Sequence, residues 1–491
     1  MTAESGWSVV AGRLAAARRR PSPQGAVAVV FTAGMFMSIM DSQIVNVAVA
    51  SLGRDFSAAP AQVQWVITGY LLSIAASIPL SGWLGDRLGT TRVYLASLAA
   101  FGGSSALCAA AQSLPELIGA RVLQGLGAGF MMPVAMAMLY RAYPPARRVH
   151  IARMITRVTV LAPATAPVIG GALIAGLSWH WIFLINVPVA GAALVFGFLF
   201  LPRTPPADPQ PFDLPGFVLA AGGLTALLYC VSTGPTAGWA TPVTIAAGVS
   251  GVLALAGFAR HSLRHPMPVL RVRLLGDRLF RKCCLMIGCS TTAFFGSLVF
   301  TALYVQEGRG GSALTSGLTT FPEAVAIGLS SQVVARLYPR AGPRRLIAAG
   351  FLGLVVVNVA LSAAGASTSL WLVRGLMFAI GLAVSYVMLP VQAAAYARIS
   401  SVDTGHATAI FTAGQRSAGA MGVALLSAVL AAGSGDRVRA PVSAFHAVYL
   451  AGAGVALVGL LLALTIRDAD AASTMGEDPE REAGGGLAGA E

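Results

Sequence analysis

Two carboxylates lie deep within apolar stretches of this sequence, and they are the groups best placed to do chemistry. Asp41 falls in the middle of a run from Ala26 to Leu52, and Glu323 follows Pro322 in a second run. A charged group in hydrocarbon costs roughly 2.5–3.5 kcal/mol even on lenient insertion scales. Each residue therefore needs a role as a proton site, an ion site or one half of a buried ion pair.

Two arginines occupy the same kind of environment. Arg121 and Arg416 both fall inside apolar runs. An arginine keeps its charge when it is buried, so each needs a partner or a hydrated cavity. Asp41 is the candidate partner of Arg121. Arg416 could pair with Glu323 or contact an anionic group of a substrate, and we favour the pairing.

The composition identifies a polytopic membrane protein. Of its 491 residues, 56% are hydrophobic and 11% are charged, and the mean hydropathy is +0.75, whereas a soluble domain carries about 25% charged residues. A helix needs about 20 apolar residues to cross a bilayer. Fourteen runs reach that length, near 26–51, 61–83, 92–111, 115–140, 153–177, 181–201, 214–233, 240–260, 283–305, 314–335, 346–364, 369–395, 405–431 and 444–466.

The net charge of +14 could indicate a nucleic-acid partner, but its placement argues against that class. With both termini in the cytoplasm, the outer linkers hold only Arg54, Arg309, Arg437 and Arg439, and the inner linkers and tails hold most other basic residues. This distribution follows the positive-inside rule. A nucleic-acid-binding protein would gather its charge on one soluble face. The basic segment 260–282 is expected to lie on anionic lipid.

A weak internal repeat divides the chain. The pattern Arg-x-Gly-x-x-Arg occurs at 87–92 and again at 340–345, and the offset between the two also carries Arg121 onto Arg374. Two landmarks at one offset indicate two related six-helix halves with two extra helices between them. Transporters are commonly built in this way, with the substrate site between the halves near the bilayer midplane.

A glycine-rich loop, residues 82–92, reads GWLGDRLGTTR and follows the second apolar run. Its first two glycines permit close approach of neighbouring backbones and its third permits a tight turn. The loop resembles the signature G-x-L-x-D-R-x-G-R-[RK]-[RK] of the major facilitator superfamily, except that Thr90 and Thr91 stand where basic residues are usual. The resemblance implies that the loop's aspartate makes an inter-helix charge contact that stabilises one conformation; a solvated turn is the alternative. The loop residues are Gly82, Gly85, Asp86, Arg87, Gly89 and Arg92.

The first apolar run carries a second resemblance. Residues 40–48 read MDSQIVNVA and resemble the L-D-x-T-I-V-N-V-A-L-P signature of the fourteen-helix drug:proton antiporter branch of that superfamily. Ser38 and Asp41 share a helical face with small residues at 34, 45 and 48, and such a face can line a cavity. We expect Asp41 to exchange a proton during transport; a purely structural ion pair is the alternative.

Two further segments resemble helix signatures of the same superfamily. Arg121, Gln124 and the glycines after them match R-x-x-Q-G-x-G, and the resemblance implies that this arginine couples proton movement to the conformational switch. A structural arginine that snorkels is the alternative. Gln415 and Arg416 begin a stretch similar to Q-Q-x-G-G-A-x-G. The candidates for lining a substrate cavity are Ser38, Gln124, Gln415 and Arg416.

The fifth run and the hairpin after it complete the resemblance. Residues 166–171, APVIGG, resemble the antiporter signature G-P-x-x-G-G, which separates exporters from symporters in this superfamily. Residues 178–188, SWHWIFLINVP, are very close to S-W-R-W-I-F-L-I-N-V-P of the same branch; we assign them no chemistry. The residues expected to bend and pack the antiporter helix are Pro163, Pro167, Gly170 and Gly171.

The resemblance implies an all-α membrane protein with the major facilitator fold, in which 14 transmembrane helices form two six-helix bundles plus two central extra helices. The expected parts are a cytoplasmic tail (1–25), an N-terminal bundle (26–201), the two extra helices with a basic cytoplasmic linker (202–282), a C-terminal bundle (283–466) and a disordered cytoplasmic tail (467–491).

The implied activity is proton-coupled antiport that exports lipophilic small molecules such as drugs or antibiotics by alternating access. Asp41, Arg121 and Glu323 are the proton-coupling candidates, with Glu323 acting as a second proton site or as a substrate contact. The expected partners are a small lipophilic molecule, protons and the membrane lipid of a bacterial plasma membrane, with no nucleic acid and with the protein a monomer.

We expect no enzyme activity, no cofactor and no metal site. The sequence contains no G-x-x-x-x-G-K-[ST] loop, so a proton gradient rather than ATP is the expected energy source. The five cysteines and six histidines show no spacing typical of zinc. Two rival interpretations stay open: a proton-coupled importer of a small nutrient, and a membrane receptor or scaffold that transports nothing.

Overall fold

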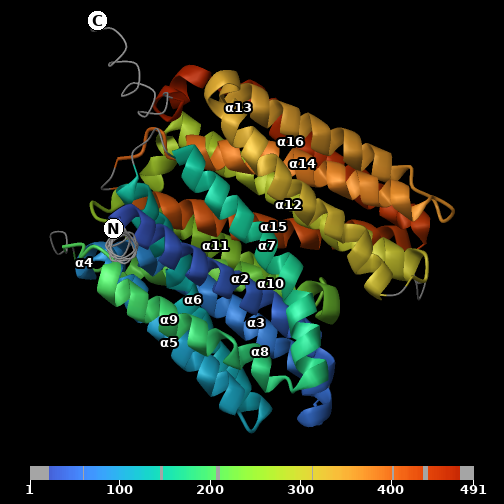
Figure 1. Cartoon of the computed structure of the whole chain (residues 1–491), viewed down its shortest axis with the longest axis horizontal. Coiled ribbons are helices and arrows are strands. Elements are labelled where there is room, and N and C mark those ends of the chain that lie inside the picture. The colour runs from blue at the N-terminus through green and yellow to red at the C-terminus, as the bar shows by residue number, and fades with distance from the viewer. Residues whose placement is uncertain are drawn as a thin grey trace, which may run out of the picture.

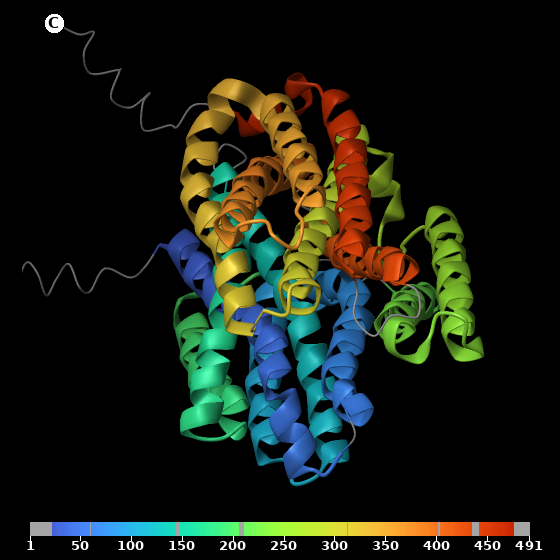
Figure 2. The same cartoon turned by 90° about the vertical axis from the view of Figure 1, so that its right-hand side faces the viewer.

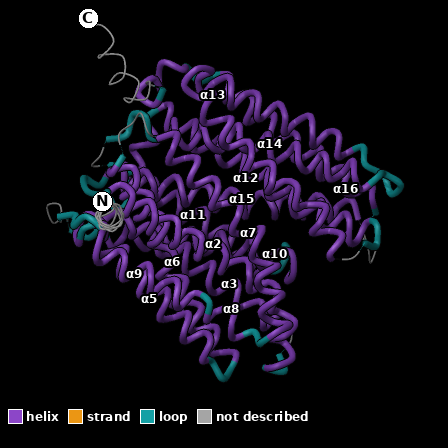
Figure 3. The backbone as a smooth tube through the Cα atoms, viewed as in Figure 1, coloured by secondary structure: helices purple, strands orange, loops and turns teal. Residues whose placement is uncertain are grey.

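The computed structural model describes residues 22–58, 60–143, 148–205, 211–311, 313–400, 403–434 and 441–475. All regular structure in these ranges is helical (Figure 3). The helices longer than ten residues are α2 (Pro23–Asp55), α3 (Pro60–Ser77), α5 (Thr90–Ala110), α6 (Leu114–Ala142), α7 (Arg148–Gly176), α9 (Asn186–Phe200), α10 (Leu214–Ala237), α11 (Pro242–Arg264), α12 (Arg278–Leu303), α13 (Ala313–Ser362), α14 (Leu370–Ala395), α15 (Thr404–Ser434) and α16 (Val442–Leu464). The short ones are η1 (Ile78–Leu80), α4 (Ser81–Leu88), α8 (His180–Leu184), η3 (Val272–Gly276), the π-turn η4 (Tyr304–Gly308) and η5 (Asp468–Thr474).

The long helices form two bundles that lie side by side. Helices α2–α9 make one bundle and α12–α16 the other, and the hairpin of α10 and α11 stands at their flank (Figures 1 and 2). Helix α10 packs against α3 of the first bundle and α15 of the second. The inserted hairpin therefore borders the interface between the bundles.

Helices are the form that an apolar chain must take in lipid, because only they satisfy every backbone hydrogen bond within one segment. Hydroxyl and carboxylate caps start several of them: Ser22 accepts from the backbone of α2, Ser113 from α6, Asp213 from α10 and Asp277 from α12.

Twelve stretches of the described residues are long and apolar enough to cross a membrane. One of them, Thr315–Ser362, runs through the break at Gly342, where φ is 74° and the helix direction changes. Helix α7 is not among the twelve, although it crosses the first bundle in Figure 1. If α13 is counted as two spans that meet at Gly342, and α7 is added to the others, the described helices are consistent with the fourteen expected spans.

The two halves carry matching turns where the repeat aligns them. Gly89 has φ 86° and Gly342 has φ 74°, a conformation that favours glycine. The linker expected at 336–345 is helical on both sides of Gly342, so the structure replaces that loop with a sharp turn between two helices.

We call the end of the bundle that carries Ser22 and Met475 the terminal end. The two bundles meet there and diverge toward the opposite end (Figure 1). Tyr140 of α6 stacks on Tyr396 at the end of α14, with ring centroids 4.1 Å apart, and Thr408 of α15 donates to the backbone oxygen of Pro133 at 3.2 Å. These contacts close the terminal end.

Part of the C-terminal segment is ordered, contrary to the expectation of a disordered tail. Helix η5 lies against α13, where the carboxylate of Asp468 accepts from the backbone N–H of Arg344 at 2.9 Å. Tyr338 and Thr474 share a hydrogen bond of 2.9 Å. A carboxylate at the first turn of a helix is favourable, and this explains why Asp468 holds the segment in place. Residues 476–491 lie outside the described ranges.

Candidate functional site

The Asp41 carboxylate lies at the centre of a buried polar network in the first bundle. Arg121 Nη1 donates to Asp41 Oδ2 at 2.6 Å, and Gln124 Nε2 and Asn186 Nδ2 donate to Asp41 Oδ1 at 3.1 and 2.9 Å. All four residues are 0% exposed. The expected partnership of Asp41 and Arg121 is therefore present, and it is sealed from both solvent and lipid.

Four elements bring this network together. Asp41 comes from α2 and Arg121 and Gln124 from α6, while Asn186 begins α9 just after the short helix α8. Ser105 of α5 accepts from both Gln124 and Asn186, at 3.0 and 3.2 Å. Each of these four helices contributes a side chain to the network, so a shift of any one of them changes the environment of the carboxylate.

Arg121 has further contacts that hold its charge. Its Nε donates to the backbone oxygen of Val66 at 3.2 Å, Nη1 also donates to Gln124 at 2.6 Å, and the guanidinium lies 3.9 Å from the ring centroid of Tyr70. Loss of one partner from a buried ion pair costs about 3–5 kcal/mol. Neutralisation of Asp41 would leave Arg121 as an uncompensated charge.

Asn186 and Ser105 are functional residues that the sequence analysis missed. Asn186 lies in the stretch 178–188, to which we assigned no chemistry, and that assignment is wrong for this residue because its side chain binds the Asp41 carboxylate. A signal was present, since Asn186 is the one strongly polar side chain in the run 181–201. Ser105 gives no such signal among the many small residues of α5.

Glu323 is buried in the second bundle without a partner. It is 2% exposed, and neither carboxyl oxygen has a hydrogen-bond partner among the described residues. Its backbone oxygen faces Gly381 of α14 so closely that a Cβ there would collide with it. A bare carboxylate in this setting would cost several kcal/mol, so the arrangement accommodates the neutral acid.

The favoured pairing of Glu323 with Arg416 is wrong for this conformation. The structure gives Arg416 a single polar contact, from Nη2 to the sulfur of Met132 at 3.6 Å. The two side chains are on α13 and α15, and α15 turns Arg416 toward the other bundle. Their shared depth within apolar runs suggested the pair, but the direction in which each side chain leaves its helix decides the contact.

A cavity of about 600 Å³ lies between the two bundles. Helices α2, α3, α6 and α7 of the first bundle and α12, α14 and α15 of the second line it, as does the inserted helix α10. Gln415 and Arg416 are among its lining residues, as the sequence analysis expected. Ser38 and Gln124 are not, because Ser38 is buried and Gln124 belongs to the Asp41 network.

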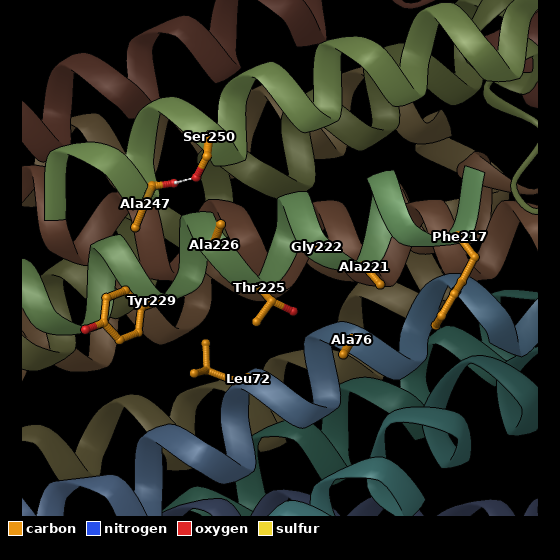
Figure 4. A pocket seen from close by; sticks show the side chains of 10 residues that line it. All are labelled: Leu72, Ala76, Phe217, Ala221, Gly222, Thr225, Ala226, Tyr229, Ala247 and Ser250. Carbon is orange, nitrogen blue, oxygen red and sulfur yellow. Dashed lines mark hydrogen bonds between the residues drawn. The ribbon is translucent and has the colours of Figure 1, made fainter. Parts of the chain in front are cut away.

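A second cavity of about 550 Å³ lies on the other side of the seam between α3 and α10. Leu72, Thr225 and Tyr229 line it, with Ser250 of α11 opposite (Figure 4). Helix α10 thus presents one face to the central cavity and a neighbouring face to this outer groove.

The glycine-rich loop lies at the terminal end, where it joins the bundles. Asp86 accepts from Arg141 at 3.1 Å, and His406 Nε2 of the other bundle lies 3.8 Å from its second oxygen. Gly82 lies against Gly405 and His406, where a Cβ would have His406 Nδ1 at 3.2 Å. Asp86 therefore makes the inter-helix charge contact that the resemblance implied.

The other loop residues divide between the turn and the surface. Gly85 is buried beside Thr90, and Gly89 approaches the backbone oxygen of Thr204 so closely that a Cβ would collide with it. The side chains of Arg87 and Arg92 are exposed. Arg87 lies 5.2 Å from the ring centroid of Trp83.

The antiporter helix α7 is described only in part. Gly170 faces Ile44 of α2 so tightly that a Cβ would lie 2.6 Å from its Cγ1, whereas Gly171 has open space beside it. One of the two glycines thus brings α2 and α7 together. The side chains of Pro163 and Pro167 lie outside the described part of the structure.

One cluster of described residues could hold a metal ion, at the base of the α10–α11 hairpin. Asp213, His261 and His265 place one ligand atom each within 4.8 Å of one another. Asp213 already accepts from His261 at 2.7 Å and from the backbone N–H of Gly216 and Val269. Burial opposes its ionisation, but these hydrogen bonds outweigh burial and lower the pKa of Asp213. The cluster closes the hairpin and joins it to the following linker.

This fold is shared with solved transporters. A structure of the human organic anion transporter MFSD10 (TETRAN) matches with a TM-score of 0.65 and 17% identity, covering 90% of this chain and 99% of that one. A structure of the proton:xylose symporter XylE matches with a TM-score of 0.62 and 17% identity, covering 90% and 95%. At this identity the likeness concerns the fold alone.

Curated relatives are closer in sequence. The Multidrug resistance protein B homolog of Mycobacterium tuberculosis is 31% identical over 400 residues, which are 80% of this chain and 74% of the relative. The Puromycin resistance protein pur8 of Streptomyces alboniger is 32% identical over 407 residues, 82% of this chain and 80% of the relative. Residues 31–423 match the family model described as Major Facilitator Superfamily. The chain therefore belongs to the Major Facilitator Superfamily and is a transporter rather than an enzyme.

Proposed function

We propose that this protein is a proton-coupled antiporter that exports lipophilic small molecules by alternating access. The observation that carries the proposal is the fully buried Asp41–Arg121 pair, which lies in a bundle that borders the central cavity. The relatives named for multidrug and puromycin resistance support export of drug-like compounds. A proton gradient supplies the energy, and no cofactor takes part.

The two bundles, 26–201 and 283–466, are the bodies that rock against each other, and the segment 202–282 bridges them. The protein works as a monomer in the cytoplasmic membrane of a bacterium. Both tails, 1–25 and 467–491, lie in the cytoplasm, in agreement with the positive-inside distribution of charge. The terminal end is then the cytoplasmic end, and its closed contacts correspond to an outward-facing state.

Protonation of Asp41 is the step that drives the change of state. The carboxylate balances Arg121 in the state described here. When a proton binds Asp41, Arg121 loses its counter-charge. The packing of α2, α6 and α9 described here then becomes less stable relative to the other conformation of the transporter, and the equilibrium between the two conformations shifts. The membrane potential contributes about 2.3 kcal/mol per charge per 100 mV. Release of the proton to the cytoplasm restores the pair.

Glu323 is a second proton site in this proposal. Its unpartnered oxygens suit a neutral acid in the outward-facing state, and movement of α13 against α14 at Gly381 is what would expose it. The contact of Asp86 with Arg141 and His406 holds the cytoplasmic end closed until then.

The test is transport in everted membrane vesicles with an imposed proton gradient. We expect accumulation of a lipophilic dye by the native protein, and a loss of at least about tenfold in rate for Asp41→Asn, which cannot cycle a proton. Glu116→Gln is the matched control, because Glu116 is an exposed carboxylate at the start of the helix that carries Arg121.

Normal transport by Asp41→Asn would refute the proton role. Dye movement in the opposite direction, out of everted vesicles, would support the importer. Absence of any gradient-driven flux across a broad set of dyes and antibiotics would support a receptor or scaffold.

A further inference from the structure

The described lining of the central cavity contains one charged group, and its sign is positive. Among the described residues that line it, Arg416 is the only ionisable side chain, and no carboxylate is present. The remaining lining is apolar or carries neutral hydroxyl and amide groups, such as those of Ser42, Gln392 and Gln415. A cavity of about 600 Å³ is the size that holds a drug-sized molecule.

Arg416 has no anionic partner among the residues that the structure describes. Its one polar contact is the thioether of Met132, which is a weak acceptor. Asp41 is bound to Arg121, and Glu323 does not reach Arg416. An unpaired guanidinium in a mostly apolar cavity attracts an anion and repels a cation, because the cavity walls offer few groups that screen the charge.

A second polar group of the lining is also without a partner. Gln392 is 3% exposed, and its side-chain oxygen has no hydrogen-bond partner among the described residues. Buried polar groups are normally hydrogen-bonded. Its amide oxygen can therefore accept from a hydroxyl or N–H group of a bound molecule.

From these contacts we infer that the transported molecule is a lipophilic anion, whose acidic group binds Arg416 and whose apolar body fills the space between the bundles. The inference rests on the proposed export function and names its substrate class. A carboxylate or phenolate suits the guanidinium, which offers paired donors in a fixed fork. Strongly cationic compounds are excluded by the same charge.

The charge of the substrate has an electrical consequence. Outward movement of an anion and inward movement of a proton both carry positive charge inward. An interior-negative potential therefore drives both halves of the exchange, whereas it would oppose the export of a cation.

Binding to the purified full-length protein in detergent tests the inference first. The probes are several lipophilic scaffolds, each prepared as the carboxylate, the methyl ester and the trimethylammonium analogue. We expect carboxylates to bind at least about tenfold more tightly than their esters, the difference expected of one charge-assisted hydrogen bond, and the ammonium analogues not to bind. Equal binding within each set, or binding of the cations alone or of no probe, overturns the inference.

Arg416→Gln separates a role in binding from a role in stability. We expect this variant to lose the preference for carboxylates while its melting temperature stays equal or rises, because an unpaired, half-buried charge has been removed. Arg416→Lys should keep part of the preference. Arg374→Gln is the matched control: Arg374 lies over the ring of Trp371 and does not line the cavity. A lower melting temperature with unchanged selectivity would show that Arg416 is structural.

Transport by proteoliposomes then distinguishes this inference from the export function. The anion specificity alone would be overturned if neutral or cationic probes are transported in a proton-driven, Asp41-dependent way and Arg416→Gln does not change that transport. Binding of carboxylates without any Asp41-dependent flux would overturn the proton-coupled export alone. If the anion specificity and the proton-coupled export are both correct, the rate of carboxylate export should depend on the membrane potential. A potassium gradient with valinomycin should raise that rate when it makes the compartment that the substrate leaves electrically negative.

Discussion

At the scale of single residues, three donors share the two oxygens of Asp41. Arg121 takes one oxygen, and Gln124 and Asn186 share the other. Hydrogen bonds to a charged group contribute about 1.5–3 kcal/mol each. The three donors together fix the position of the carboxylate between α2, α6 and α9.

Replacement of Asn186 by leucine removes one donor and keeps the volume of the side chain. A hydrogen bond to a charged group contributes about 1.5–3 kcal/mol, so we expect Asn186→Leu to lower the rate of proton-driven efflux by at least about tenfold. The measurement is the initial efflux rate in proteoliposomes under an imposed proton gradient.

The matched control is Asn358→Leu, which removes a buried amide from the second bundle. Asn358 donates to the backbone of α13 and accepts from Ser297, so this change should lower stability without lowering the efflux rate per folded molecule. An unchanged efflux rate for Asn186→Leu would contradict a role for this side chain in transport.

At the residue scale, one contact of the site could be predicted from the sequence and another could not. The partnership of Asp41 with Arg121 could be predicted, since a buried charge needs an opposite one. The absence of a bond between Glu323 and Arg416 could not, because it depends on the rotation of α13 and α15 about their axes. Hydropathy carries little information about rotation when helices are apolar on every side.

At the scale of elements, two threonines hold the turn before α5. Thr91 Oγ1 donates to the backbone oxygen of Pro202 at 2.6 Å, and both Thr90 and Thr91 lie within 3.1 Å of the Thr204 hydroxyl. Their side chains are 3% and 6% exposed. The basic side chains that are usual at these two positions would be buried in this structure. The hydroxyl groups of Thr90 and Thr91 instead bind the segment after α9, and we call these hydrogen bonds the clamp of this turn.

Thr91→Val keeps the shape of the side chain and removes its hydroxyl. The backbone oxygen of Pro202 then loses its partner, so we expect a loss of about 1–3 kcal/mol in stability, seen as a lower melting temperature of the purified protein. Thr465→Val is the control, because the Thr465 hydroxyl is exposed and bonds within its own helix end. Equal melting temperatures for the two variants would exclude the clamp.

In the second bundle, a carboxylate rather than a hydroxyl group holds the matching turn. At the matching turn, the Asp468 carboxylate of η5 lies against Gly342 and accepts from the backbone of Arg344. The internal repeat in the sequence predicts both turns, because each needs a glycine at one position. The clamps could not be predicted, since they come from segments far along the chain that share no pattern.

At the scale of the whole molecule, the helical structure of the long apolar runs follows from hydropathy alone. Lipid leaves an apolar chain no other regular structure unless it closes a barrel, so each predicted run became helical. The position of the α10–α11 hairpin did not follow, because its two runs carry no motif. Its place beside the cavity emerges only from packing against α3 and α15.

The molecule as a whole must open its terminal end to complete a cycle. One close approach of the bundles there joins Gly82 and Gly405, where a Cβ on Gly405 would lie 3.7 Å from the Cα of Gly82. Cysteines at the two positions therefore fall within the span of a disulfide, whose Cα atoms lie about 5.5 Å apart.

We expect the double variant Gly82→Cys, Gly405→Cys to stop transporting when it is oxidised and to recover when it is reduced, with the reduced protein as its own reference. Ligand binding should persist in the oxidised form, because the closed end lies away from the Arg416 contact. The ring of His406 must yield slightly to admit the new side chain. Continued turnover by the cross-linked protein would mean that the bundles need not separate at this end, and alternating access by rocking would fail for this protein.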